Sequence, residues 1–175
     1  MLIDQISKLM VRGFSIPSLG IHIQGMQYGS SKNIIGDFFR LTYIENAGMA
    51  FGFDLGWKHL FGIISILASL LILYYLFISR NSNFGFRLSL AMILAGAIGN
   101  LIDRVFYGVI FGYGELFHGR VVDFFDVDFF NISILGYHLD RWPVFNIADA
   151  SVTIGVVLLL ISHKSSHNQQ TKSEF

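Results

Sequence analysis

Residues 143–161 read PVFNIADASVTIGVVLLLI, and apart from one carboxylate this stretch has the composition of a membrane-spanning helix. The exception is Asp149, and no Lys or Arg lies within one helical turn of it. An ionisable side chain at membrane depth costs roughly 2.5–3.5 kcal/mol on insertion scales, and such residues usually face a protein interior or a water-filled cavity. The stretch therefore predicts a membrane helix in which Asp149 has a functional role.

The composition is typical of an integral membrane protein. Of the 175 residues, 53% are hydrophobic and 14% are charged, whereas a soluble domain carries about 25% charged residues. The formal net charge is zero, which gives no reason to expect a nucleic-acid partner. Because the chain has no cysteine, disulfides, thiolate metal sites and a cysteine nucleophile are excluded.

Three segments are long and apolar enough to be membrane spans, which need about 20 mostly apolar residues. They cover residues 57–79, 86–107 and 143–163. Pro143 is well placed to begin the third helix. Small residues at Gly96, Gly99 and Gly155 allow the second and third helices to approach closely. These features predict an all-α transmembrane bundle.

The remaining segments do not have the character of membrane spans. Residues 1–56 contain strand-like alternation in GIHIQGMQYG at 20–29 and in FFRLTYI at 38–44, which predicts a small β-rich unit at the membrane surface. Residues 108–142 form a connector whose length favours a functional role. The polar tail, residues 164–175, is predicted to be disordered. The whole chain is expected to form one domain.

Polar residues at membrane depth form two clusters. Asn100, Asp103 and Arg104 share one face of the second predicted span, and Asn146 and Asp149 share one face of the third. Each asparagine can be interpreted either as an interhelical hydrogen-bonding group or as a substrate contact. Asp103 beside Arg104 predicts a structural charge pair.

A third acid, Asp123, lies among bulky apolar neighbours in GRVVDFF, whereas Asp126 and Asp128 are predicted to be solvated loop acids. Two carboxylates that share a site cannot both ionise easily, so the pair holds one proton between them. The ionised member can take a proton from a water that attacks a peptide carbonyl, while the protonated member donates to the carbonyl oxygen. Asp123 and Asp149 are therefore the candidate pair for an aspartic protease.

The sequence offers little other hydrolytic machinery. It contains no G-x-S-x-G nucleophile elbow and no H-E-x-x-H zinc motif, and its six histidines are scattered without ligand spacing. Lys58, at the edge of the first predicted span, is the one lysine within the three spans, so a serine–lysine dyad at membrane depth would lack its base. An aspartate pair needs no metal, no cofactor and no covalent intermediate.

Five stretches, spread over nearly the whole chain, form a specific combination of motifs. They are DQISK at 4–8, ENAGMAFGF at 45–53, GAIGNLIDR at 96–104, GRVVDFF at 119–125 and PVFNIADASVTIG at 143–155. In this order they resemble the motifs of the bacterial lipoprotein signal peptidases (signal peptidase II), a family of membrane aspartyl proteases.

The resemblance implies roles for individual residues. The catalytic aspartates of the family fall on Asp123, in the V-V-D-F match, and on Asp149, in the F-N-x-A-D match. The implied substrate-cleft residues are Asn46, Asn100, Arg104 and Asn146. The implied supporting residues are Asp4, Gln5 and Asp103.

The resemblance also implies a reaction, a fold and a location. The expected reaction is cleavage of a diacylglyceryl-modified prolipoprotein on the N-terminal side of its lipidated cysteine. The expected fold is a bundle of four membrane helices, three of them visible here, with a small periplasmic β-cradle. The protein would be a multi-pass, monomeric protein of the bacterial inner membrane with its active site towards the periplasm. Its expected partners are the prolipoprotein and membrane lipid, with no nucleic acid, metal or cofactor.

The sequence departs from the family pattern at two places. In the family, D-Q-x-S-K closes a first membrane helix, so we expect either about 15–20 further apolar residues upstream in a longer reading frame or a truncated chain. The segment 104–123 is longer than in the shorter family members, and its extra residues are expected at the mouth of the active site. In addition, most Lys and Arg residues fall on the expected periplasmic side, contrary to the positive-inside rule.

Two other functions fit parts of the sequence. A proton-coupled transporter subunit would use Asp149 as its carrier, coupled to Asp103, and would not need Asp123. The sequence has only three predicted spans and no inverted repeat, and both observations argue against a transporter. A non-catalytic membrane assembly factor would use residues 108–142 as a docking surface and would tolerate replacement of either candidate acid by Asn.

Overall fold

The computed structural model describes residues 1–48, 58–128, 132–134, 137–139 and 141–173, with side chains for residues 1–48, 62–128 and 141–162. The helices in these residues are α1 (Leu2–Arg12), the short 3-10 helix η1 (Pro17–Leu19), α2 (Lys58–Ile78), α3 (Phe84–Ile110) and α4 (Ile147–Ser173). The strands are β1 (Gly13–Ile16), β2 (Ile21–Gln24), β3 (Ser31–Ile35), β4 (Phe39–Asn46), β5 (Val121–Val127), β6 (Ile132–Ile134) and β7 (Tyr137–Leu139). Residues 49–53 of the ENAGMAFGF motif and residue 57 of the first predicted span lie outside the described residues.

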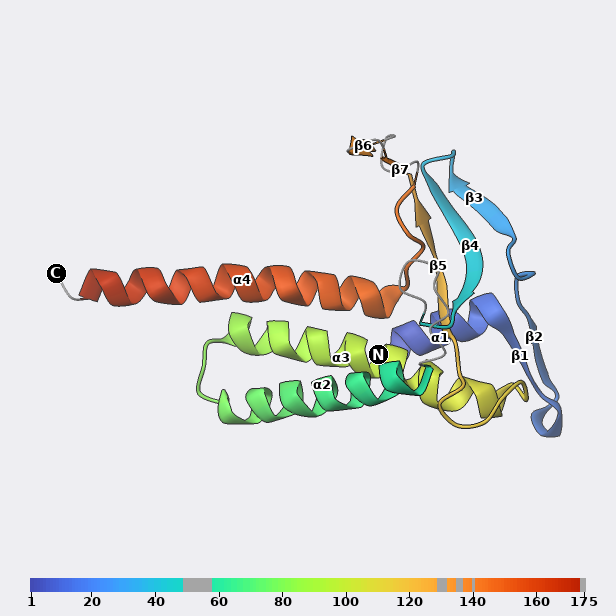
Figure 1. The fold of residues 1–175 in the computed structure, drawn as a ribbon, viewed down its shortest axis with the longest axis horizontal. Helices are drawn as coiled ribbons and strands as arrows, with labels where there is room; N and C mark the ends of the chain where they lie inside the picture. Colours follow the sequence, from blue (N-terminus) through green and yellow to red (C-terminus); the bar gives the residue numbers. More distant parts are fainter. Residues whose placement is uncertain (49–57, 129–131, 135–136, 140, 174–175) are drawn as a thin grey trace.

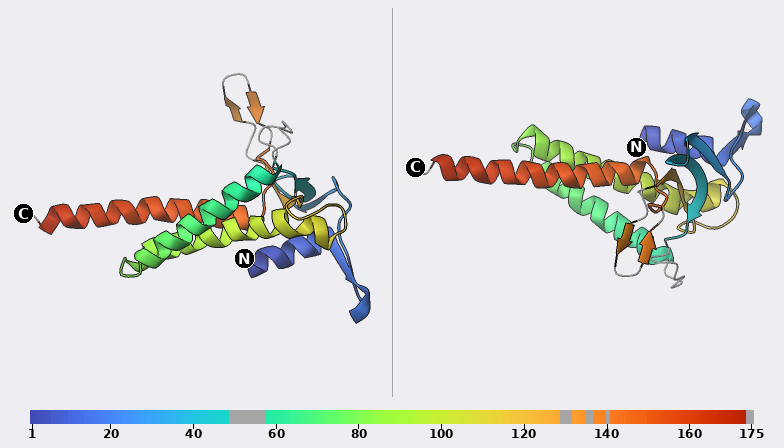
Figure 2. Two further views of the ribbon diagram at one scale, coloured as in Figure 1. Left: turned by 60° about the horizontal axis from the view of Figure 1, so that its bottom comes forward. Right: turned by 90° about the horizontal axis from the view of Figure 1, so that it is seen from above.

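The long helices lie side by side, and the sheets gather at one end of them. α2 and α3 form an antiparallel hairpin, α4 packs along α3, and α4 extends beyond the α2–α3 turn (Figure 1). The short α1 lies near the opposite end, where α3 ends, α4 begins and the strands are found (Figures 1 and 2). This arrangement places the N-terminus of α4 next to the sheet.

Glycines let α3 and α4 approach closely. A Cβ atom at Gly96 would lie 2.3 Å from the carbonyl oxygen of Ala148, and one at Gly155 would lie 2.9 Å from the carbonyl oxygen of Ser89. Any larger residue at these positions would push the two backbones apart. The close approach expected at Gly96 and Gly155 is confirmed, and it holds the first turn of α4 against the middle of α3.

The central sheet has the strand order β3–β4–β5, and both pairs are antiparallel. In the β4–β5 pair, Ile44 lies opposite Asp123. A further bridge joins Phe125 of β5 to Phe145, just before α4. β5 therefore carries Asp123 between the end of β4 and the start of α4.

A small apolar core lies where α1, α3, β4 and β5 meet. Its buried members are Val11, Tyr43, Tyr107, Val122 and Phe124. The two stretches with strand-like alternation contribute β2 and β4, as predicted. Residues distant in sequence are thus fixed around one packed centre next to Asp123.

Several predicted boundaries differ from the observed ones. α4 begins at Ile147 and not at Pro143, because Asn146 caps it. It continues to Ser173, where the sequence predicts a disordered tail, and no Gly or Pro between residues 164 and 173 ends the helix. The connector 108–142 contains the last turn of α3 and strands β5, β6 and β7.

Asp126 is not the solvated loop acid that the sequence predicts. It lies on β5 with 6% of its surface exposed, and it accepts hydrogen bonds from Thr42 Oγ1 and Arg141 Nε, both at 2.6 Å. Asp128, at the end of the strand, also contacts Arg141. The prediction failed because β5 pairs with β4 and the chain returns alongside it at Arg141, and neither contact is visible in the local sequence.

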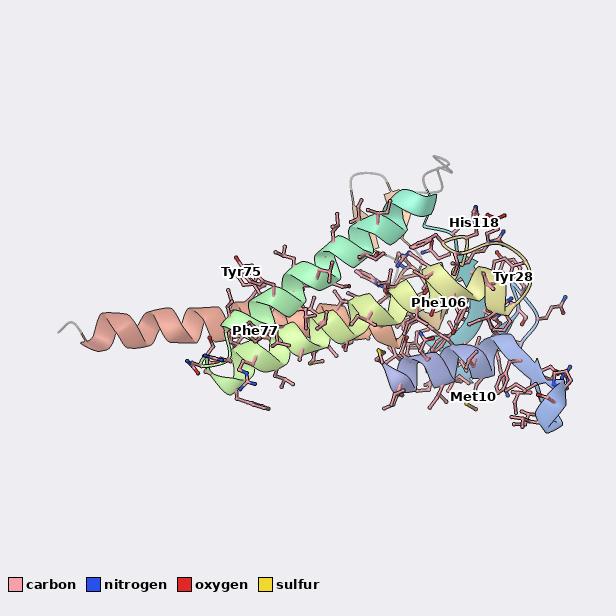
Figure 3. All side chains as sticks on the ribbon, turned by 90° about the horizontal axis from the view of Figure 1, so that it is seen from below. Met10, Tyr28, Tyr75, Phe77, Phe106 and His118 are labelled. Carbon is pink, nitrogen blue, oxygen red and sulfur yellow. The ribbon has the colours of Figure 1, made fainter. Side chains whose placement is uncertain are left out.

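The helices have the apolar surfaces of a membrane protein. In the described part of the chain, α3 is long and apolar enough to cross a membrane, and shorter apolar segments cover Gly62–Ile78 and Ile147–Ser162. Tyr75 and Phe77 of α2 point outwards and are 49% and 69% exposed (Figure 3). A helical fold with small antiparallel sheets is confirmed, whereas three or four membrane crossings stay a prediction.

Candidate active site

α4 begins with a reciprocal pair of hydrogen bonds between Asn146 and Asp149. Asn146 Oδ1 accepts from the backbone N–H of Asp149 at 3.0 Å, and Asp149 Oδ2 accepts from the backbone N–H of Asn146 at 3.2 Å. This is a capping box, which satisfies N–H groups that a helix N-terminus leaves unpaired. Asp149 therefore lies in the first turn of an apolar helix, where negative charge is favoured, and not in its middle.

Two asparagine side chains connect Asp149 to Asp123. Asn146 Nδ2 donates to Asp123 Oδ1 at 2.6 Å and to Asn100 Oδ1 at 3.1 Å. Asn100 Nδ2 in turn donates to Asp149 Oδ1 at 2.7 Å. The structure thus brings together four of the predicted site residues, from α3, β5 and the start of α4.

Asp123 is almost completely buried, with 3% of its surface exposed. Burial, and then the neighbouring charge of Asp149, raise the pKa of Asp123 to about 7, although hydrogen bonds from Asn146 and Asn46 act in the opposite direction. A carboxylic acid with a pKa near neutrality can hold a proton and release it during a reaction. The contact from Asn46 also brings the end of β4 into the site.

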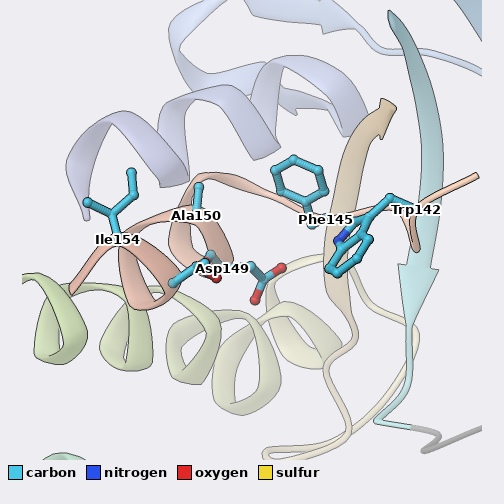
Figure 4. Close-up of a pocket in the computed structure, with 6 residues that line it drawn as sticks. Trp142, Phe145, Asp149, Ala150 and Ile154 are labelled. Carbon is cyan, nitrogen blue, oxygen red and sulfur yellow. The ribbon is translucent and has the colours of Figure 1, made fainter. Parts of the chain in front are cut away.

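Asp149 lines a largely apolar cavity of about 330 Å³. The other lining residues are Trp142, Phe145, Ala150, Thr153 and Ile154. Figure 4 shows the rings of Phe145 and Trp142 to one side of the Asp149 carboxylate and Ile154 to the other. An apolar segment of a ligand can therefore lie directly beside this carboxylate.

Arg104 lies one helical turn after Asn100 on α3 and interacts electrostatically with Asp103, Asp149 and Asp123. Within the part of the chain that the structure describes, its buried Nε has no hydrogen-bond partner. Buried donors are rarely left unpaired in native proteins. This N–H group is therefore available to a ligand carbonyl oxygen.

The ion pair of Asp103 is formed with Lys8, whereas the sequence predicts Arg104, whose charge interacts with Asp103 without an ion-pair contact among the described residues. Lys8 Nζ lies 2.9 Å from Asp103 Oδ2 and 3.1 Å from Asp4 Oδ2. Lys8 comes from α1, so the spacing of residues along α3 could not reveal this pairing. The available signal was the i, i+4 spacing of Asp4 and Lys8 in DQISK, which places both on one helical face.

The three predicted supporting residues lie together behind the aspartate pair. Gln5 Nε2 donates to Asp103 Oδ1 at 2.8 Å and to the carbonyl oxygen of Gly99 at 3.0 Å. Asp4 Oδ1 accepts from the backbone N–H of Ala148 at 2.9 Å. α1 thus supplies a further cap for α4. Gly99 makes room for the Asp4 side chain, because a Cβ atom at Gly99 would lie 2.8 Å from Asp4 Oδ2.

The long segment between Arg104 and Asp123 packs on the end of α1. The Arg12 guanidinium lies 3.8 Å from the centre of the Phe111 ring and pairs with Glu45. Arg120 lies 3.8 Å from the same Glu45 carboxylate. Because Glu45 directly precedes Asn46, the segment is joined to the strand end that contacts Asp123.

These features are those of a helical membrane protein in which hydrogen bonds link two carboxylates, one from a strand and one from a helix N-terminus, and in which the second carboxylate lies beside an apolar cavity. The chain belongs to the signal peptidase II family, because the family model described as signal peptidase (SPase) II matches residues 1–164.

Individual relatives agree with the family model. A lipoprotein signal peptidase from Chlorobium phaeobacteroides (strain DSM 266) is 36% identical over 141 residues, which cover 81% of this chain and 77% of the relative. One from Halothermothrix orenii is 38% identical over 160 residues, which cover 91% and 86%. A bacterial membrane enzyme solved by the in meso method at 2.3 Å resolution matches with a TM-score of 0.67 and 32% identity, covering 96% of this chain and 84% of that one.

Proposed function

We propose that this chain is an aspartic endopeptidase that removes the signal peptide from diacylglyceryl-modified prolipoproteins, cleaving on the N-terminal side of the lipidated cysteine. Membership of the signal peptidase II family supports proteolysis of lipoprotein signal peptides. The observation that carries the aspartic mechanism is the hydrogen-bonded connection between Asp123 and Asp149. The relatives give no support to a transporter subunit or an assembly factor.

The surroundings of the two carboxylates favour different roles. Both oxygens of Asp149 accept hydrogen bonds, one from Asn100 Nδ2 and one from the Asn146 backbone N–H, at the N-terminus of α4, so donors surround this carboxylate and it can accept a further proton only from a reacting water. Asp123 is buried and its pKa is raised to about 7, which favours its protonated form. We therefore assign Asp149 as the general base and Asp123 as the general acid.

The reaction then proceeds with balanced proton transfers. Asp149 takes a proton from water as the water oxygen attacks the scissile carbonyl carbon, and Asp123 gives its proton to the carbonyl oxygen. In the second step, the protonated Asp149 gives its proton to the leaving nitrogen while the carbon–nitrogen bond breaks. Asp123 takes back the proton from the hydroxyl group as the carbonyl reforms. Both carboxyl groups return to their starting states.

Other site residues are proposed to hold the substrate. The apolar cavity beside Asp149 suits an apolar side chain near the cleavage site. The unpaired Nε of Arg104 can donate to a backbone carbonyl oxygen of the peptide. Asn46, at the end of β4, can form a hydrogen bond with the same peptide segment. Such contacts hold a peptide extended, which exposes the scissile carbonyl to water.

The site lies where the long helices meet the sheet (Figure 1). A signal peptide's apolar helix ends at a membrane surface, so a site at this end of the bundle meets the cleavage position without unwinding the whole helix. We propose a multi-pass protein of the inner membrane with this end towards the periplasm, acting as a monomer. Its partners are the lipid-modified substrate and membrane lipid.

The proposal is tested by processing of a lipidated prolipoprotein by the purified protein in detergent. Wild type is expected to cleave, whereas Asp123→Asn and Asp149→Asn are expected to lose at least about a hundredfold in kcat/KM, because each lacks one proton-transfer group. Asp128→Asn, near the end of the same strand as Asp123, serves as the matched control and should retain activity. An Asn variant at either proposed catalytic position that cleaves as fast as wild type would contradict the two-carboxylate mechanism.

A further inference from the structure

Lys8 is a fully buried cation that the mechanism above does not use. Its side chain is 0% exposed, and Nζ contacts Asp103 Oδ2 at 2.9 Å and Asp4 Oδ2 at 3.1 Å. A third contact leads out of this charge cluster towards the reacting groups: Nζ donates to Asn100 Oδ1 at 3.0 Å. Asn100 is the residue whose Nδ2 donates to Asp149.

The third contact decides which way the Asn100 amide faces. An ammonium group only donates hydrogen bonds, so it requires the oxygen of Asn100 on its side. The amide nitrogen is then directed to Asp149 Oδ1, at 2.7 Å. With the amide reversed, two donors would face each other at Lys8 and two acceptors at Asp149, and both contacts would be lost.

Asn146 alone is a weaker constraint on this amide. Its Nδ2 has two hydrogens but three acceptors: Asp123 Oδ1 at 2.6 Å, Asn100 Oδ1 at 3.1 Å and the Val122 carbonyl oxygen at 3.3 Å. The shortest of these contacts goes to Asp123. A separate donor at Lys8 therefore secures Asn100 and leaves Asn146 free to hold Asp123.

We infer that Lys8 is a positioning residue of the active site, which fixes the Asn100 amide so that it donates to Asp149. This inference rests on the proposed protease function, in which Asp149 is the base. If Lys8 had a purely structural role, it would act only on its ion-pair partners Asp4 and Asp103. As a positioning residue, it also acts on the Asp149 carboxylate by orienting Asn100.

The first experiment removes Lys8 together with one of its two carboxylate partners, which keeps the net charge of the wild type. Lys8→Met alone leaves two buried carboxylates without their cation and can prevent folding, so it is combined with Asp4→Asn and compared with Asp4→Asn alone. Relative to Asp4→Asn, the double variant is expected to lose about tenfold or more in kcat with KM unchanged, because Lys8 does not touch substrate. The control is a partly exposed ion pair on the central sheet, Arg40 with Asp37, and Arg40→Met/Asp37→Asn should keep wild-type kcat. Equal kcat in Asp4→Asn and in the double variant would overturn the inference.

The second experiment asks whether the effect passes through Asn100. In an Asn100→Ala background, adding the Lys8 substitution should change kcat less than about twofold, because the coupled partner is already missing. An undiminished loss would show that Lys8 acts by another route and would overturn the inference.

A final readout does not depend on cleavage. The side-chain NH2 resonances of Asn100, identified by their loss in Asn100→Ala, should shift in Lys8→Met/Asp4→Asn relative to Asp4→Asn. Unchanged resonances would refute the link between Lys8 and Asn100 even if the protein cleaves. A shift together with an inactive wild type would instead preserve the link and count against the proposed protease function, so the two failures can be told apart.

Discussion

Asp123 carries the proton that the proposed mechanism needs, and its surroundings fix the pH at which that proton is lost. Burial and the nearby charge of Asp149 raise its pKa to about 7. We expect kcat/KM to fall above pH 7 by about tenfold per pH unit, because the general acid of the free enzyme is then deprotonated. A pH–rate profile with the lipidated substrate measures this, and a rate that is flat from pH 7 to pH 9 would exclude Asp123 as the acid.

The same pKa makes folding stability depend on pH. In the unfolded chain Asp123 titrates near the ordinary value of about 3.9, whereas in the folded protein its pKa is about 7. The folded state therefore binds more protons between these values, and the free energy of unfolding should decrease as pH rises from about 4 to about 7. Thermal unfolding in detergent across this range measures the slope. Asp123→Asn should flatten the curve, whereas Asp128→Asn should keep the wild-type slope.

At the scale of secondary structure elements, the position of α4 against α3 decides where Asp149 lies. A Cβ atom at Gly96 would meet the Ala148 carbonyl oxygen, which belongs to backbone and cannot rotate away. We expect Gly96→Ala to shift the first turn of α4, to lower the free energy of unfolding by about 1–3 kcal/mol and to reduce kcat. Leu88→Ala, at a partly exposed position of the same helix, is the control. Wild-type kcat and stability in Gly96→Ala would show that the helices can separate without disturbing the site.

The local capping signals belong to this scale too, and they were available in the sequence. Asn146 and Asp149 have the spacing of a capping box, and recognising it would have placed the start of α4 correctly. The i, i+3 spacing predicts a shared helical face, whereas in the structure it places the two residues in a reciprocal cap at the start of α4. The second cap, from Asp4 to the Ala148 N–H, joins residues far apart in the chain and could not be read from local spacing.

At the scale of the whole molecule, Arg141 attaches the segment that leads into α4 to the central sheet. Its Nε donates to Asp126 at 2.6 Å, and its Nη1 donates to the Asp37 carbonyl oxygen at 3.0 Å. We expect Arg141→Ala to lower the free energy of unfolding by on the order of 3 kcal/mol, because it leaves the buried Asp126 without its cation.

Arg40 offers the matched comparison for Arg141. It pairs with Asp37, whose side chain is 78% exposed, so Arg40→Ala should change stability by about 0.5 kcal/mol or less. Hydrogen exchange at the β5 amides, compared between the two variants, locates the effect. Equal exchange rates in both variants would show that Arg141 does not hold the sheet to the segment before α4.

Four features of the protein follow from its amino-acid sequence: the apolar helices, the strand pattern of β2 and β4, the close helix approach at Gly96 and Gly155, and the acids of the candidate pair. These are properties of composition and short-range spacing, which follow from the periodicity of helices and strands. The five motifs also led to the family that the comparisons show.

Which charges form ion pairs depends on the three-dimensional fold. Asp103 pairs with Lys8 of α1, and Asp126 pairs with Arg141 beyond the sheet. Neither partner is the nearest opposite charge in the sequence, because a buried carboxylate pairs with the cation that lies next to it in the folded protein. The same holds for Asp123 and Asp149, which approach each other because β5 pairs with β4 and the glycines of α3 let the start of α4 come close.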